Sequence, residues 1–210
     1  RVLIMATEKR WVVLPDPPQT FFDEFPELPT TAARLLYHRG LTTQEEIDEF
    51  LDPEWNRHVH DPFLFKDMKR AVERLKQAIQ TGEQITIHGD YDADGVSASV
   101  ILYTTLQILG GKVNVFLPHR ETDGYGVNKN TVAMLASEGT KLMITCDCGI
   151  ASVEEIIEGN KLGIDTIITD HHMMKEILPP AYAILHPKVA NETYPFKDLA
   201  SVGLVAKLVH

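Results

Sequence analysis

Before residue 52, apolar residues recur with helical spacing in two short segments. The first, over 30–39, is followed by Gly40, a residue type that commonly ends helices. In the second, Thr43 stands three residues before Glu46, which is the spacing of a capping box, and Pro53 ends the stripe. We therefore expect a small helical N-terminal region over 1–66, with an irregular proline-rich entry and an irregular connector over 52–66. Residues 1–4, which precede Met5, are left out of this interpretation.

From Asp67 onward, helical stripes alternate with short apolar runs. Helices are expected over 68–81, 96–109, 128–138, 152–161 and from about 199, and strands over 84–87, 113–117, 142–145, 166–169 and 182–185. This alternation predicts an α/β domain over 67–210, in which a mostly parallel sheet is covered by helices on both faces. Ligands of such sheets bind at the carboxyl ends of the strands.

The first predicted strand ends in a group of ionisable residues: His88, Asp90, Asp92 and Asp94. They occupy even positions, so their side chains project to one side wherever the chain stays extended. So many carboxylates together require cations. A calcium-binding EF-hand loop is excluded because its twelfth position would be Ile101 and an apolar strand precedes it. A helix cap would explain one carboxylate but not three.

Two further strands also end in residues that can bind metals. Asp147 ends the third strand, and Asp170, His171 and His172 follow the fourth. Carboxylate and imidazole ligands suit manganese or magnesium better than zinc. Two such ions are a known arrangement for phosphoester hydrolysis, and a histidine outside the metal shell can protonate the leaving oxygen. The spacing of these residues leaves the substrate open.

Composition changes this interpretation little. The net charge is −10, yet residues 67–210 carry 13 basic and 18 acidic side chains, and five of those acids belong to the strand-end motifs. Bound divalent cations would offset these five, so the acidity does not exclude a phosphate-bearing substrate. Two cysteines, Cys146 and Cys148, are predicted to pack within a strand, and they fit a reducing, cytoplasmic setting. The sequence contains no apolar stretch of roughly 20 residues, so a membrane partner is not expected.

Four strings in order, HGDYDADGVSA, PHRETDGYG, CDCGI and TDHH, resemble the DHH phosphoesterase superfamily, and within it the RecJ-type exonucleases. The resemblance covers residues 30–210. It implies a manganese- or magnesium-dependent enzyme that removes nucleotides from single-stranded DNA in the 5′ to 3′ direction during recombination and repair. It also implies single-strand-binding protein and a helicase as partners.

The resemblance further implies a role for each candidate residue. One ion would be held by His88, Asp92 and Asp147, and the other by Asp94, Asp147 and His171, so that Asp147 bridges both. The residues expected to act on the ligands or on the phosphate are Asp90 and Asp170, which would orient ligands, and His172, which would face the scissile phosphate. Contacts with the substrate are expected from Arg120, Gly124, Tyr125 and Gly126.

The chain also departs from this pattern. Ser201 stands where the family usually has a glycine, and the next family motif and the second domain would lie beyond His210. We therefore expect an N-terminal fragment, which leaves open whether one metal site is complete and whether the fragment is active. Two alternatives stay open. One is another DHH hydrolase acting on short oligonucleotides, a cyclic dinucleotide or pyrophosphate, and the other is a non-catalytic replication scaffold on the same fold.

Overall fold

The computed structural model describes residues 10–119, 121, 124 and 126–210. The chain divides into two compact units, of which the first ends at Val59 and the second runs from His60 to His210. This division falls inside the segment that the sequence predicts as a connector. That segment contains a one-turn helix, α4 (Trp55–His58), and a 3₁₀ turn, η1 (Pro62–Leu64).

The N-terminal unit is built from short helices around five buried apolar side chains. The helices before α4 are α1 (Gln19–Glu24), α2 (Thr30–Tyr37) and α3 (Gln44–Leu51), and the buried side chains are Phe21, Phe25, Ala33, Leu36 and Ile47. The predicted capping box of α3 is present, because Thr43 Oγ1 accepts from Glu46 N and Glu46 Oε2 accepts from Thr43 N. The expectation of a wholly irregular entry is wrong. Pro18 precedes the first turn of α1, where a missing N–H does no harm, and burial of Phe21 holds the helix.

The C-terminal unit contains a five-stranded parallel sheet in the order β2-β1-β3-β4-β5. Its strands are β1 (Gln84–Gly89), β2 (Lys112–Phe116), β3 (Thr140–Cys146), β4 (Asp165–Thr169) and β5 (Ala183–Leu185). The predicted parallel α/β architecture is confirmed. Because His88 lies opposite Thr145 and Cys146 lies opposite Thr169, the neighbouring strands β1, β3 and β4 end nearly level.

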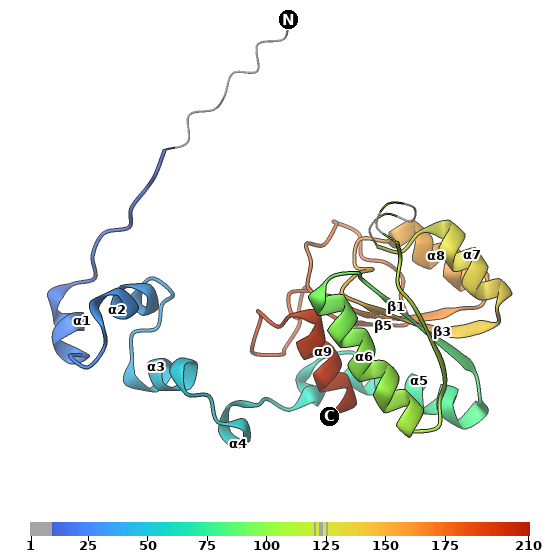
Figure 1. The fold of residues 1–210 in the computed structure, drawn as a ribbon, viewed down its shortest axis with the longest axis horizontal. Coiled ribbons are helices and arrows are strands. Elements are labelled where there is room, and N and C mark those ends of the chain that lie inside the picture. Colours follow the sequence, from blue (N-terminus) through green and yellow to red (C-terminus); the bar gives the residue numbers. More distant parts are fainter. Residues whose placement is uncertain (1–9, 120, 122–123, 125) are drawn as a thin grey trace, which may run out of the picture. The chain divides into compact units, whose positions relative to one another are not determined.

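Helices cover both faces of this sheet (Figure 1). One face packs against α5 (Met68–Thr81), α6 (Ala93–Ile108) and α9 (Ser201–Val209), and the other against α7 (Lys129–Ser137) and α8 (Val153–Lys161). Ile85 and Ile87 of β1 belong to the first core, while Met143 and Ile168 of β3 and β4 belong to the second. Both faces of the central strands are therefore buried, which explains their nearly continuous apolar sequence.

Helix α6 begins at Ala93, three residues earlier than the expected residue 96. Asp92 is its N-cap, and Asp92 Oδ1 accepts from Asp94 N at 2.9 Å and from Gly95 N at 3.1 Å. The extended spacing assumed for residues 88–94 is therefore wrong beyond Asp90. Glycine is required at 95, because a Cβ there would lie 2.6 Å from the Asp90 carbonyl oxygen. Among the described residues, no helix is long and apolar enough to cross a membrane.

Arg74 on α5 ties that helix to the amino ends of two strands. Its Nε donates to Asp165 Oδ2 at 2.7 Å, and a terminal nitrogen donates to Glu83 Oε2 at 2.6 Å. The Arg74 side chain is only 7% exposed, whereas the ion pair of Lys69 with Glu73 on the same helix lies at the surface. Removing a nearly buried guanidinium would leave two carboxylates without their cation.

We predict that Arg74→Ala lowers the free energy of unfolding by about 2–4 kcal/mol, because a half-buried charge network is broken. The control, Lys69→Ala, removes an exposed pair from the same helix and should change this free energy by less than about 1 kcal/mol. Urea denaturation followed by far-ultraviolet circular dichroism measures both variants. Equal effects of the two substitutions would mean that the Arg74 network adds nothing beyond a surface pair.

Candidate metal centre

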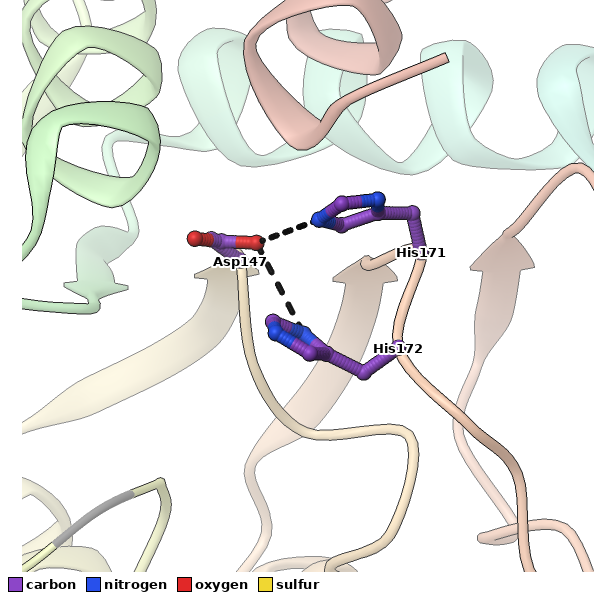
Figure 2. A group of neighbouring side chains, drawn as sticks. All are labelled: Asp147, His171 and His172. Atoms are coloured by element: carbon purple, nitrogen blue, oxygen red, sulfur yellow. Dashed lines mark ion pairs between the residues drawn. The ribbon is translucent and has the colours of Figure 1, made fainter. Parts of the chain in front are cut away.

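Asp147 and the histidine pair His171–His172 meet at the carboxyl ends of β3 and β4 (Figure 2). His171 Nε2 lies 3.2 Å from Asp147 Oδ1, and His172 Nδ1 lies 3.7 Å from the same oxygen. Asp147 is buried, while the two imidazoles are partly exposed. The Asp147 carboxylate therefore lies at the buried end of the site, and the two histidines lie on its solvent-exposed side.

Asp147 belongs to two groups of potential metal ligands. In one group it is joined by His171 and His172, and in the other by Asp90 and Asp92. Within each group, one ligand atom from each residue lies within 4.8 Å of the others. A residue common to both groups can bridge two ions, which is the role that the family resemblance implies for Asp147.

The backbone around Asp147 has a conformation that the sequence alone does not reveal. Asp147 has φ 63°, in the left-handed region, and its N–H donates to the Thr169 carbonyl oxygen at 2.9 Å. Gly149 follows with φ 104°, where a Cβ would lie 2.8 Å from Thr145 Oγ1. This turn reverses the chain directly after β3, so the Asp147 carboxylate stays at the end of the sheet.

Two carboxylates of the site, Asp147 and Asp90, have raised pKa values. Burial, followed by the charge of Asp94, raises the pKa of Asp147 to about 7. Burial also raises the pKa of Asp90, and the neighbouring Asp92 adds to the shift. Asp90 Oδ1 is buried without a hydrogen-bond partner among the described residues. A divalent cation would offset this excess of negative charge, so the residues present fit a manganese or magnesium ion.

Asp170 orients the histidine pair. Its Oδ1 accepts from His171 N at 2.7 Å and from His172 N at 3.1 Å, and it lies 2.8 Å from His172 Nδ1. Its Oδ2 accepts from Ile150 N at 2.9 Å, which joins the loop after β3 to the loop after β4. Burial lowers the pKa of His172, but the hydrogen bond and charge of Asp170 outweigh this effect and leave the pKa raised. His172 thus has its ring direction set by a buried carboxylate.

Asp94 is positioned by a helix that sequence reasoning did not connect with it. Asp94 Oδ2 accepts from Ser201 N at 2.8 Å, and Oδ1 accepts from Val202 N at 2.7 Å, so the carboxylate caps the N-terminus of α9. Asp94 Oδ2 also lies 3.5 Å from His171 Nε2. Asp94 is therefore near the site but outside both ligand groups. Its partners on α9 are more than 100 positions away, and no local pattern indicates such a contact.

His88 is fully buried on β1, and its ring lies beside Phe116 of β2. Like Asp94, it is outside the two ligand groups identified among the described residues. Its Nδ1 lies 3.6 Å from the sulfur of Cys148. Asp92, by contrast, is exposed, belongs to one ligand group and caps α6. Hydrogen bonds from the Gly95 and Asp94 amides lower the pKa of Asp92, although burial opposes them.

A cavity of about 520 Å³ opens beside His172. Asp170, Lys175 and Gly126 also line it, so the structure brings one glycine of the predicted substrate string to the site. Gly124 is exposed with φ 77° and does not line this cavity. Arg120 and Tyr125 lie outside the described residues.

Comparison with known proteins shows which family the chain is similar to. Residues 84–210 match the DHH family, N-terminal domain. The chain is 42% identical over 209 residues to the single-stranded-DNA-specific exonuclease RecJ of Bacillus subtilis, and 32% identical over 186 residues to that of Escherichia coli. These alignments cover 99% and 87% of the chain but only 26% and 31% of the relatives, so the chain spans less than a third of their length.

A solved structure is also similar. RecJ from Thermus thermophilus in complex with Mn²⁺ matches with a TM-score of 0.71 and 31% identity, over 95% of this chain and 28% of that one. The matched residues 84–210 contain every described candidate ligand, from His88 to His172. On its sequence and its fold, the chain belongs to the DHH family.

Proposed function

We propose that the chain carries the metal-binding part of an exonuclease that hydrolyses phosphodiester bonds of single-stranded DNA from the 5′ end. The observation that carries the proposal is the position of Asp147, which belongs to two ligand groups at one edge of the sheet. The similarity to RecJ exonucleases supports single-stranded DNA as the substrate.

Asp147 would be shared between two Mn²⁺ or Mg²⁺ ions. The resemblance to DHH phosphoesterases implies that His88 and Asp92 would hold one ion, and Asp94 and His171 the other. When bound, such ions supply an activated water and neutralise charge on the attacked phosphate. The structure adds Asp90 as a neighbour of Asp92 and Asp147, so this residue either joins the first set or orients it.

His172 would act on the phosphate directly. Its Nδ1 faces the buried Asp170, which leaves Nε2 as the ring atom able to hydrogen-bond to a phosphate oxygen or to protonate the leaving oxygen. The hydrogen bond and charge of Asp170 raise the pKa of His172 despite its burial, which shifts the ring toward its protonated form. Asp170 would not touch the substrate, because it is buried and hydrogen-bonded to the loop amides.

Other parts of the proposal rest on the sequence resemblance. Gly124, Gly126, Arg120 and Tyr125 would line the path of the DNA strand, and of these Gly126 borders the cavity beside His172. Single-strand-binding protein and a helicase are the proposed partners in recombination and repair. A cytoplasmic location is part of the same proposal, and two buried free cysteines support it.

We predict that Mn²⁺ stabilises the protein and that Asp147→Asn removes most of this effect, because the shared ligand is lost from both sites. At a hundredfold excess over Kd, a bound ion stabilises the folded state by about 2.7 kcal/mol. Thermal unfolding with and without Mn²⁺ measures the shift. Asp198→Asn, which changes an exposed carboxylate, is the control and should retain the full response. A full manganese response in Asp147→Asn would exclude the bridging role.

Without metal, Asp147→Asn should instead stabilise the folded protein. The folded-state pKa of Asp147, about 7, lies above its unfolded value of 3.8, so ionisation of Asp147 reduces stability as the pH rises from about 4 to 7. We therefore predict that Asp147→Asn raises the melting temperature in EDTA at pH 8 and raises it less at pH 5. Urea unfolding at the two pH values should show a difference on the order of 1 kcal/mol or more. A pH-independent difference would contradict the raised pKa.

The direction of hydrolysis tests the exonuclease assignment. With Mn²⁺ present, a single strand labelled at its 5′ end should release its label at once, whereas a strand labelled at its 3′ end should shorten progressively. Gel electrophoresis over time distinguishes the two patterns, and Asp147→Asn provides the inactive control. Shortening from the 3′ end, or cleavage of di- and trinucleotides alone, would replace this proposal with a short-oligonucleotide hydrolase.

A further inference from the structure

The sulfur of Cys148 makes two contacts with a single residue on another strand. Cys148 Sγ lies 3.6 Å from His88 Nδ1 and 3.6 Å from the His88 carbonyl oxygen. The two residues are 60 positions apart. The left-handed turn at Asp147 directs the chain back toward β1 immediately after β3 ends, which places the sulfur next to the imidazole.

Only one placement of the hydrogens makes both of these contacts hydrogen bonds. Because Cys148 is fully buried among apolar side chains, its thiol keeps its hydrogen, and the S–H donates to the His88 carbonyl oxygen. The sulfur can then accept a hydrogen bond from His88 only if Nδ1 carries the ring proton. In that tautomer the lone pair lies on Nε2, so Nε2 is the ring nitrogen whose chemistry suits a metal ion.

We propose that Cys148 is a positioning residue, which holds His88 in the Nδ1–H tautomer and so directs the Nε2 lone pair toward the metal site. The inference rests on the proposed role of His88 as a metal ligand. It assigns to a thiol the task that carboxylates and carbonyl groups usually perform for histidine ligands. In the same site, the Asp170 carboxylate orients the ring of His172, which is not a proposed ligand.

Cys148 does not itself suit metal binding. It packs with Met143, Ile150 and Ile156 in the core beneath α7 and α8, and burial raises the pKa of its thiol well above the ordinary value. Metal binding would require the thiolate, which this surrounding disfavours. A role through His88 therefore fits its position better than a role as a ligand.

The chain offers a matched control in Cys146. It is equally buried and lies on the other side of Asp147 in sequence, but it packs in the opposite core, with α5, α6 and α9. Substituting either cysteine removes one buried sulfur next to Asp147. Of the two cysteines, only Cys148 is within hydrogen-bonding distance of His88 in the part of the chain that the structure describes.

The tautomer of His88 provides the direct test. Metal-free protein with ¹⁵N-labelled histidine is studied at pH 8 by long-range ¹H–¹⁵N correlation, and the His88 signals are those lost in His88→Gln. The parent and Cys146→Ala should show the Nδ1–H form. Cys148→Ala should show a gain in the Nε2–H form, and Cys148→Ser should restore the parent pattern, because a hydroxyl both donates and accepts. An unchanged tautomer in Cys148→Ala would overturn the inference.

Manganese binding provides a second measurement. Titration calorimetry should show Mn²⁺ affinity falling about tenfold or more at one site in Cys148→Ala, as for other groups that orient metal ligands, and remaining unchanged in Cys146→Ala. An equal loss in both variants would mean that only core packing is involved, which also overturns the inference. If Asp147→Asn leaves manganese binding intact, the proposed function fails, while the tautomer result still stands by itself.

Discussion

Repulsion among the carboxylates around buried Asp147 is the constraint on which the rest of the site depends. Three of the other acids are compensated by backbone N–H groups: Asp92 by the start of α6, Asp94 by the start of α9 and Asp170 by three loop amides. Burial, followed by the charge of Asp94, raises the pKa of Asp147 to about 7, although two imidazoles lie close to its carboxylate. Backbone N–H dipoles therefore stabilise most of these carboxylates. The charge of Asp147 is left for a divalent cation to balance.

The separate cores on the two faces of the sheet explain why the histidines of this site differ in burial. Along β1, Ile85 and Ile87 enter one core while His88 lies on the opposite side, near Phe116 and Cys148. His88 is therefore shielded from solvent, whereas His171 and His172 lie on a loop and remain partly exposed. Under the proposed function, the neighbours of His88 in the core would set its tautomer. His172, which is partly exposed and lines the cavity, would have access to a phosphate.

Part of the fold and of the site could be predicted from local pattern. Alternating helical and strand periodicities gave the parallel sheet, and the positions of Asp147 and Asp170 at the ends of β3 and β4 followed from it, because parallel strands end at one edge. The prediction that residues 88–94 stay extended was wrong beyond Asp90. Asp92 caps a helix, since its carboxylate satisfies amides that would otherwise lack partners, and this local hydrogen bonding outweighs strand continuation.

By itself, the sequence determined which residues stand at the strand ends, because burial periodicity and turn residues are local properties of the chain. Only the tertiary structure decided which of those residues meet. The strand order places β1, β3 and β4 side by side, a left-handed turn at Asp147 returns Cys148 to His88, and α9 brings its first amides to Asp94. These contacts join residues 60 to 108 positions apart, and they arise from how the helices pack on the two faces of the sheet, for which no short sequence pattern carries the information.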